Sequence, residues 1–332
     1  MNRPRKQHLV PKLLLKSFAD EKEKIFVFDK FQNKSFISSV NDIATERDFY
    51  NTSTRKLYEL TDDEQILLEI KNMADGLNLS TDELNDHMEF FIENFFATNI
   101  EPKLKRILNN ISSVLTLCVE LKKAENAIRY LKPDIALMIA YLLCRSKEFI
   151  TSHNERMLSA TQIMYDLHLE QTQGQQKDDT QIKMNDNFNS WIHADILSSN
   201  LPIEIANGIL NHHWYLGISN KINPFIISDN PVATSGNGFV TTKEYISFPL
   251  SSTLSLILVG KGLLKSTKWT TKIKILLLEN DAVGDLNKRQ LECSYKQVFG
   301  NKETIEDLIR NIDLKSIERK PSPLVTGRKI KK

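Results

Sequence analysis

The stretch from Ile135 to Cys144 constrains the fold more than any other part of the sequence, because all ten of its residues are hydrophobic. A helix built from them would be apolar on every face, as in the centre of a core. Pro133 suits the first turn of this helix, and Asp134 beside it favours the positive end of the helix dipole. The stretch is about half of the roughly twenty residues that a membrane span requires. We therefore expect a deeply buried helix and no segment that crosses a bilayer.

Capping boxes predict where other helices begin. Thr61 to Glu64 and Ser80 to Glu83 each place a hydroxyl three residues before a glutamate, so that side chains and backbone N–H groups can bond reciprocally. Thr98 and Glu101 have the same spacing and predict a third box. From Leu84 to Phe95, apolar residues recur at helical spacing and predict an amphipathic helix. Further helices are expected near 11–18, after Pro102, at about 153–170, 283–295 and 304–312, with a loop at 171–177.

Segments rich in β-branched and aromatic residues predict strands towards both ends of the chain. These segments are 24–29, 35–38, 211–219, 225–228, 245–250, 254–259 and 273–278. The first two flank the turn residues Gln32 and Asn33 and predict a hairpin, and the segments at 211–219 and 225–228 predict a second one. The pattern indicates an α+β fold with an N-terminal hairpin, a central helical layer and a C-terminal, mostly antiparallel sheet of about five strands with terminal helices.

No internal repeat or linker divides the chain, which favours one domain over residues 1–332. Within it we expect an N-terminal hairpin segment at 1–60, a helical layer at 61–200, a sheet with helices at 201–318 and a basic tail at 319–332.

The net charge of +2 argues against a polyanion binder by bulk charge, but both ends of the chain are basic. The basic residues at the ends are Arg3, Arg5, Lys6, Lys12, Lys16, Arg319, Lys320, Arg328, Lys329, Lys331 and Lys332. These ends are either solvated tails or contacts to nucleic acid. Three widely spaced cysteines and the lack of an export signal favour a reducing, cytoplasmic location.

The common catalytic templates are missing: there is no Gly-rich phosphate loop, nucleophile elbow, paired-histidine zinc motif or dinucleotide fingerprint. The strongest local signal is Ser228-Asp229-Asn230-Pro231, because an acid at the end of a buried strand is held rigidly beside an open turn. Such an aspartate can bind a metal or act as a base. It can equally cap the turn by bonding its own backbone.

Three further residues have both a functional and a structural interpretation. Arg145 ends the apolar helix, where its charge complements the dipole or binds a phosphate. In a strand, His213 shares a face with Tyr215, whereas His212 shares one with Trp214, so His213 is the better candidate for a binding residue. Glu101 is either a cap residue or a site carboxylate.

Several motifs together resemble the domain-of-unknown-function family 4238. They are Lys6 to Pro11, Leu15, Phe18-Ala19, Asp48-Phe49-Tyr50, Ile100-Glu101, Arg145, Ser228 to Pro231, Phe248-Pro249-Leu250 and Leu286-Asn287. In place of the family's Gln-x-x-Arg-Thr-like stretch, this chain has Tyr-Leu-Leu-Cys-Arg-Ser at 141–146, so only Arg145 carries over. The resemblance spans nearly the whole chain and implies a set of polar candidate positions: His8, Asp48, Glu101, Arg145, Asp229 and Asn287.

Our hypothesis is that these positions meet in one cleft between the helical layer and the C-terminal sheet. Asp48, Glu101 and Asp229 would hold Mg²⁺ or Mn²⁺, because hard cations prefer carboxylate oxygens. His8 would be the general acid or base, and Arg145 would stabilise charge on a phosphate. Asn287, Asn230 and His213 would help bind the substrate. This arrangement predicts a metal-dependent nuclease and, by analogy, a bacterial phage-defence effector.

Two alternatives remain open at this stage. In the first, the protein is a non-catalytic interaction protein, and the same polar residues form a buried network that fixes the helical part against the sheet. In the second, it is an enzyme that acts on a small nucleotide in an enclosed pocket.

Overall fold

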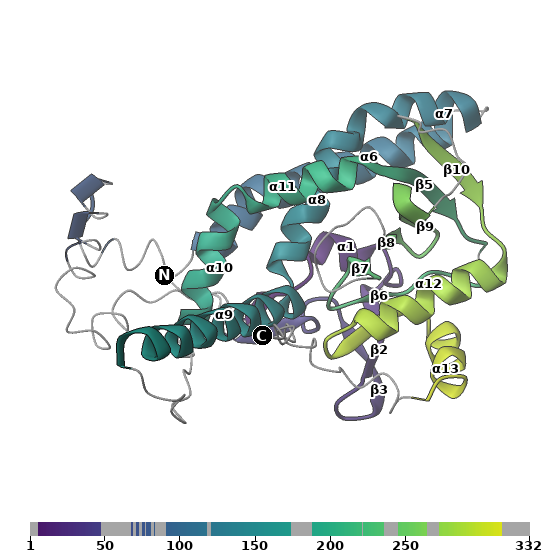
Figure 1. The fold of residues 1–332 in the computed structure, drawn as a ribbon. Helices are drawn as coiled ribbons and strands as arrows, with labels where there is room; N and C mark the ends of the chain where they lie inside the picture. Colours follow the sequence, from purple (N-terminus) through teal and green to yellow (C-terminus); the bar gives the residue numbers. More distant parts are fainter. Residues whose placement is uncertain are drawn as a thin grey trace.

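A computed structural model of the chain describes residues 6–47, 91–117, 121–173, 188–220, 222–235, 245–263 and 272–313, with isolated positions between 68 and 83 (Figure 1). As expected, its α+β architecture combines a helical layer, an N-terminal hairpin and a C-terminal sheet. Among these described residues, no helix is long and apolar enough to cross a membrane.

The predicted apolar helix, α8 (Lys132–Arg145), lies at the centre of the helical layer. Ten of its side chains are buried, and Pro133 lies in its first turn as the sequence indicated. Its main partner is α11 (Leu201–Leu210). The other long elements of the layer are α6 (Glu101–Leu117), α7 (Leu121–Ile128), α9 (Lys147–Gln173) and α10 (Phe188–Ser198).

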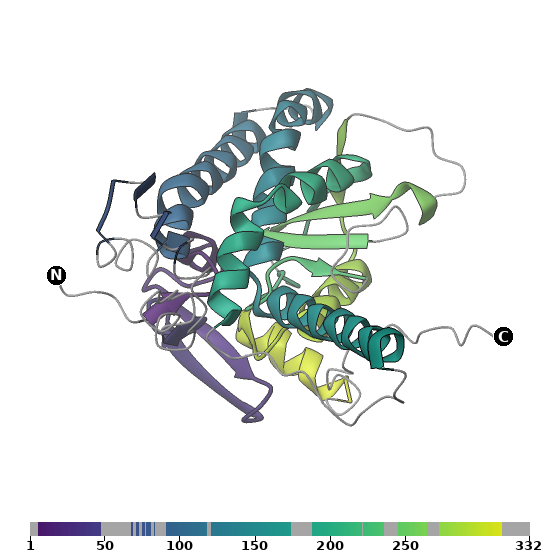
Figure 2. The ribbon, with the colours of Figure 1, turned by 60° about the vertical axis from the view of Figure 1, so that its left-hand side comes forward.

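A five-stranded sheet lies against this layer, in the order β10-β5-β9-β8-β7 (Figure 2). The strands are β10 (Ile273–Leu277), β5 (His212–Ile218), β9 (Leu254–Gly260), β8 (Tyr245–Ser251) and β7 (Ala233–Thr234). All pairs are antiparallel except β10 with β5, so the sheet is mostly antiparallel, as predicted.

The two faces of this sheet differ in burial. On one face, Trp214, Leu216 and Leu258 are at most 1% exposed, and the Trp214 indole donates to the Ile209 carbonyl of α11 at 3.2 Å. On the other face, Ser247, Ser255 and Ile257 are also buried, whereas Tyr215 and Val259 are half-buried and Lys274 is exposed. The helices therefore cover one face of the sheet and leave part of the other accessible.

The N-terminal hairpin, β2 (Lys24–Asp29) with β3 (Lys34–Ser39), is confirmed, but it belongs to a second sheet with the order β3-β2-β11-β6. Here β11 (Gln297–Gly300) lies between β2 and β6 (Ile227–Ser228). The predicted hairpin of 211–219 with 225–228 is therefore wrong, because β6 pairs with β11 and β5 pairs with β9 and β10.

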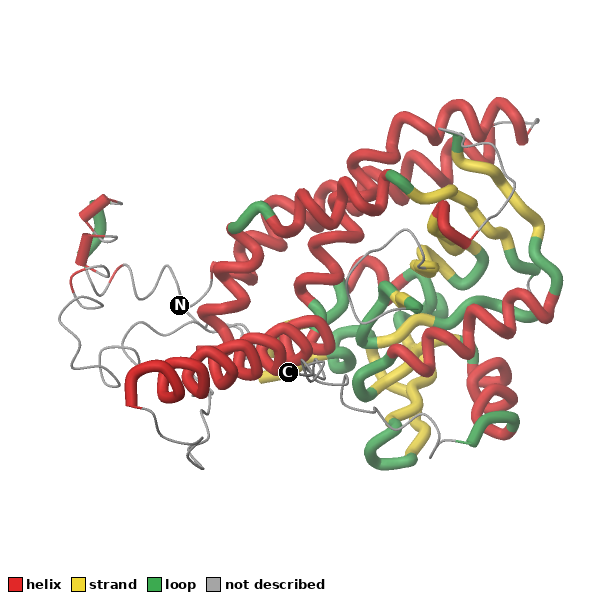
Figure 3. The backbone as a smooth tube through the Cα atoms, in the orientation of Figure 1, coloured by secondary structure: helices red, strands yellow, loops and turns green. Residues whose placement is uncertain are grey.

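The remaining elements join or flank the two sheets (Figure 3). Strand β1 (Lys6–His8) pairs with β4 (Thr45–Arg47), and neither strand was predicted from the sequence. The short helix α1 (Lys12–Lys16) and the C-terminal helices α12 (Asn280–Cys293) and α13 (Lys302–Arg310) agree with the predicted ones. The 3-10 turn η3 (Lys261–Leu263) follows β9, and η2 (Arg129–Leu131) precedes α8.

The helix starts and ends confirm one prediction and correct others. The box at Ser80 is confirmed, since the Glu83 carboxylate accepts from the Ser80 N–H and the Ser80 hydroxyl accepts from the Glu83 N–H. The box at Thr98 is wrong: α5 (Phe91–Phe95), the π-helix η1 (Phe96–Ile100) and α6 are continuous, and the Thr98 hydroxyl donates to the Asn94 carbonyl. Helix α9 extends beyond 153–170 at both ends and includes 171–173 of the expected loop. The box at 61–64 and residues 174–177 lie outside the described part.

Candidate functional site

Arg145, at the end of α8, joins three segments that are far apart in the sequence. Its side chain is 1% exposed and donates to the main-chain carbonyl of His8 in β1. Its guanidinium lies 3.7 Å from a carboxylate oxygen of Glu93 in α5, and 4.2 Å from the centre of the Phe96 ring. The predicted approach of His8 to Arg145 is therefore present, although it involves the backbone of His8.

Burial, together with the charges around Arg145, shifts the pKa values of its neighbours. Burial raises the pKa of Glu93, and nearby Glu101 raises it further, while Arg145 acts in the opposite direction. Burial and Arg145 lower the pKa of His8, although a bond to the Val40 carbonyl opposes them. Burial, with Arg145, lowers the pKa of His193 to about 3, so that imidazole is neutral at physiological pH. Of these three groups, only Glu93 has a pKa shifted towards neutrality, whereas the pKa values of both histidines are lowered.

Sequence reasoning missed Glu93 because it lies in an aromatic, apolar stretch that was interpreted only as a core stripe. An acid between Ile92 and Phe95 was the available signal. The π-helix that begins three residues after Glu93 is visible only in the structure, and such turns often occur at functional sites.

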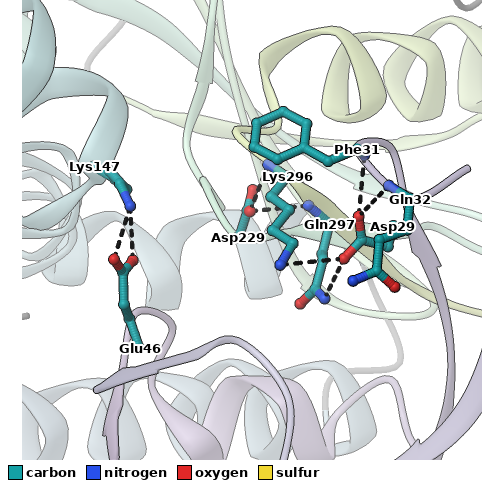
Figure 4. Close-up of polar contacts among 8 residues, drawn as sticks. All are labelled: Asp29, Phe31, Gln32, Glu46, Lys147, Asp229, Lys296 and Gln297. Carbon is teal, nitrogen blue, oxygen red and sulfur yellow. Dashed lines mark hydrogen bonds and ion pairs between the residues drawn. The ribbon is translucent and has the colours of Figure 1, made fainter.

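Asp229 lies in a different environment, in the turn after β6, and is 5% exposed. Its carboxylate accepts from three consecutive backbone N–H groups at the start of β11, those of Tyr295 at 2.8 Å, Lys296 at 2.7 Å and Gln297 at 2.9 Å. Figure 4 shows the last two bonds beside Asp29, which holds the β2–β3 turn in a similar way. Burial raises the pKa of Asp229 to about 6, opposed by these donors and by Lys30.

Helix α12 holds the rest of this turn through side-chain amides. Asn287 accepts from the Ile226 N–H and donates to the Pro224 carbonyl, both at 3.0 Å. Gln290 accepts from the Ser228 hydroxyl at 3.0 Å and donates to the Pro231 carbonyl at 3.1 Å. Asn230 donates to the Cys293 carbonyl at 3.1 Å. Asp229, Asn230 and Asn287 thus form a buried hydrogen-bond network.

The predicted metal ligands fit a divalent cation poorly at Asp229, since both oxygens of its carboxylate are engaged by backbone donors. Across the described ranges, no three His, Cys, Asp or Glu side chains are grouped so that they could hold a metal ion. Asp48 lies outside those ranges. The predicted Mg²⁺ or Mn²⁺ site therefore stays a prediction that depends on Glu101 and Asp48.

His213 lies at the start of β5, among lysines from three other segments. The side chain is 3% exposed, and its pKa is lowered by burial and by the charges of Lys261, Lys274 and Lys132. His212, on the other face as predicted, bonds the Gly208 carbonyl at 3.0 Å. His213 is therefore the predicted site residue that lies among several positive charges.

The lysines around His213 differ in exposure. Lys261 of η3 and Lys274 of β10 are exposed, whereas Lys132 at the start of α8 is 7% exposed. The Lys132 ammonium lies 5.0 Å from the centre of a Trp214 ring. Burial and the charge of Lys261 lower the pKa of Lys132 to about 8. Burial is the larger cause, and the contribution of Lys261 shows that positive charges lie close together here.

The sequence around this end of the sheet extends the positive charge. Among the described residues between 245 and 278 there are three lysines, Lys261, Lys272 and Lys274, and no aspartate or glutamate. Helix α7, which packs beside β10, adds the exposed Lys122. The acid of that helix, Glu125, accepts a hydrogen bond from the Ile275 N–H of β10 at 3.0 Å. We call Lys132, Lys261, Lys274 and His213 the basic end of the sheet.

Comparison with known proteins supplies a family but no activity. The model of a family described as "Protein of unknown function (DUF4238)" matches residues 6–304. No curated protein and no solved structure matches the chain.

Proposed function

Since the chain belongs to the DUF4238 family of proteins of unknown function, we propose a function from its geometry: it binds nucleic acid through the basic end of the sheet. The observation that carries this proposal is the position of the exposed Lys261 and Lys274 at the end of the sheet where β5 begins, beside His213. Phosphate contacts by lysines supply most of the affinity of nonspecific nucleic-acid binding. In this proposal the predicted residues Asp229, Asn230 and Asn287 hold the fold together.

The proposal is supported by the difference between polar side chains that bond within the protein and lysines that are exposed. Asp229 and Asn287 satisfy backbone groups, and Arg145 donates to a main-chain carbonyl, so these groups are bonded within the protein. Lys261 and Lys274 are exposed, which suits contacts to a phosphate backbone. The predicted cytoplasmic location, where such a partner is present, is part of the same proposal.

The test is fluorescence anisotropy with labelled single-stranded and duplex oligonucleotides over a range of salt concentrations. We expect the double variant Lys261→Glu, Lys274→Glu to bind at least tenfold more weakly, with a salt slope smaller by about 2. Lys34→Glu, an exposed lysine in β3 of the other sheet, is the matched control and should bind like wild type. Equal binding by the double variant and wild type, or no binding by wild type at low salt, would reject the proposal.

A second candidate, phosphodiester hydrolysis, is favoured by Glu93. Its half-buried carboxyl has a raised pKa and lies beside Arg145, which is the environment of an acid–base group. In this candidate Arg145 positions Glu93, and His8 and Glu101 complete the surroundings. Cleavage of labelled RNA and DNA with Mg²⁺ or Mn²⁺, lost in Glu93→Gln, would support it, and no cleavage by wild type under either metal would remove it.

A further inference from the structure

The accessible face of the five-stranded sheet places aromatic rings and cations in adjacent rows. His213, Val259 and Tyr245 lie opposite one another across β5, β9 and β8. The next row contains Tyr215 and Ile257, with Lys274 opposite Tyr215 in β10. Residues that lie opposite each other share a face of the sheet, so the two tyrosines lie on the face opposite Trp214, where each packs partly against the core.

The spacing of Tyr215 and Tyr245 suits two separate stacking positions. They are two strands apart across the sheet and two residues apart along it, which places their Cα atoms about 12 Å from each other. Both are half-buried, so each ring presents part of its surface. The guanidinium of Arg289 in α12 lies 5.7 Å from the centre of the Tyr245 ring.

A pocket of about 500 Å³ lies at the Tyr245 end of this face, between the sheet and α12. The sheet contributes Tyr245 and Ile257, Leu278 follows β10, and α12 contributes charged side chains, Asp285, Lys288, Arg289 and Glu292. This volume is within the range of small-ligand sites. The pocket therefore offers a ring for stacking, two cations for a phosphate and two carboxylates that can accept from hydroxyl groups.

Rings on a sheet face can stack only on bases that are not already paired and stacked in a duplex. A double helix would meet the lysines through its phosphates but would leave both tyrosines unused. A single strand can place its bases on the rings while its backbone follows the lysines. The carboxylates of Asp285 and Glu292 favour a ribose, because its 2′-hydroxyl is a hydrogen-bond donor that deoxyribose lacks.

We propose that single-stranded RNA is the occupant of this face, with one base stacked on Tyr215, another on Tyr245, and the ribose of the second beside Asp285 in the α12 pocket. This inference rests on the proposed nucleic-acid binding and specifies its ligand. The phosphates would run towards Lys274 and Lys261 at the basic end of the sheet, and Lys288 and Arg289 would face the phosphate in the pocket.

The experiment compares binding of labelled oligouridine, oligothymidine and an RNA duplex by ring-removing and ring-retaining variants. Tyr215→Leu and Tyr245→Leu keep apolar bulk without a ring, and each should weaken oligouridine binding by about tenfold. Tyr215→Phe and Tyr245→Phe keep the ring and should bind within about twofold of wild type. Phe31→Leu, a 66% exposed aromatic in the β2–β3 turn, is the control for loss of an unrelated ring. Circular dichroism checks that each variant is folded.

The outcomes separate this inference from the proposed function. The inference is supported if wild type prefers oligouridine over the duplex and if this preference is lost in the Leu variants and kept in the Phe variants. It is also supported if Asp285→Ala prefers oligouridine over oligothymidine less than wild type does. Equal binding of single strand and duplex, unaffected by the Leu variants, overturns the inference and leaves nucleic-acid binding standing. Equal binding of oligothymidine and oligouridine overturns the assignment to RNA. Failure of all three probes to bind overturns both proposals.

Discussion

Replacement of Asp229 by alanine tests whether the predicted site residues hold the fold or form a site. The carboxylate accepts from the N–H groups of Tyr295, Lys296 and Gln297, so its removal leaves three donors in an environment where Asp229 is 5% exposed. A buried donor without a partner costs about 1–3 kcal/mol. Because water can enter the space vacated and satisfy part of this set, we expect a loss of about 3–5 kcal/mol.

This loss would be large beside the roughly 5–15 kcal/mol by which domains are usually stable. Asp229→Asn should lose somewhat less, because one amide oxygen still accepts while the amide NH₂ faces a donor. The assay is urea unfolding at neutral pH, followed by circular dichroism and by tryptophan fluorescence, to which buried Trp214 contributes. Asp307→Ala, at a 69% exposed carboxylate in α13, is the control and should change stability by less than about 0.5 kcal/mol.

Glu101→Ala supplies the comparison within the candidate site, since Glu101 influences Glu93 only through its charge. We expect it to be nearly neutral. A change of less than about 1 kcal/mol for Asp229→Ala would refute our assignment of this residue to the fold. It would return Asp229 to the class of residues that are retained for activity, which often tolerate removal without loss of stability.

Three further predictions concern the sheet and its basic end. Lys132→Met should stabilise the protein by at most about 3 kcal/mol at pH 7, because the pKa of Lys132 falls from 10.5 in the unfolded chain to about 8 in the folded protein. Below pH 8 the folded protein therefore carries an unfavourable buried charge, and this penalty disappears as the pH rises from 8 to about 10.5. Urea unfolding of wild type and variant at pH 7 and 10.5 measures the difference, and destabilisation by the substitution at pH 7 would contradict the prediction. Nucleic-acid binding by wild type should tighten as the pH falls from 7.5 to 5.5, because bound phosphates raise the lowered pKa of His213 and favour its charged form. In His213→Gln this pH dependence should be absent. Anisotropy at both pH values checks the prediction, and the same pH dependence in the variant as in wild type would exclude His213 as the cause. Gly217→Ala should lower the free energy of unfolding by about 1–3 kcal/mol, since the added Cβ would lie 2.7 Å from Leu278 Cδ1 and 2.9 Å from Ile257 Cδ1. Thermal unfolding measures this loss. If the variant were as stable as wild type, these two side-chain ends would be able to move away without cost.

Local patterns predicted the elements of the fold better than their partners. The apolar stretch at 135–144 could only be a buried helix, and β2, β3, β5, β8, β9 and β10 follow from their residue types. Pairing is a different problem, because it depends on contacts between distant segments. Residues 225–228 have the composition of a strand, but nothing nearby in the sequence indicates that their partner is β11, some seventy residues later.

The candidate site was predicted only in part for the same reason. The approach of Arg145 to His8 joins residues 137 positions apart, and Glu93 was hidden within an apolar stripe. Asp229 and Asn287 were predicted as site residues, yet residue type alone does not say whether a buried polar group bonds a substrate or the backbone. The hydrogen-bond partners decide that question, and for both residues they are backbone groups.

Helix α12 connects these backbone contacts with the accessible face of the sheet. Asn287 and Gln290 lie on the side of the helix that bonds the turn around Asp229, whereas Asp285 and Arg289 line the pocket. A helix held by apolar packing alone would need to bury more of its surface against the sheet. Because amide bonds fix α12 from one side, its other side can remain beside a pocket and half-buried tyrosines. Asn287, which was predicted as a catalytic residue, would then support binding by holding α12 beside the pocket.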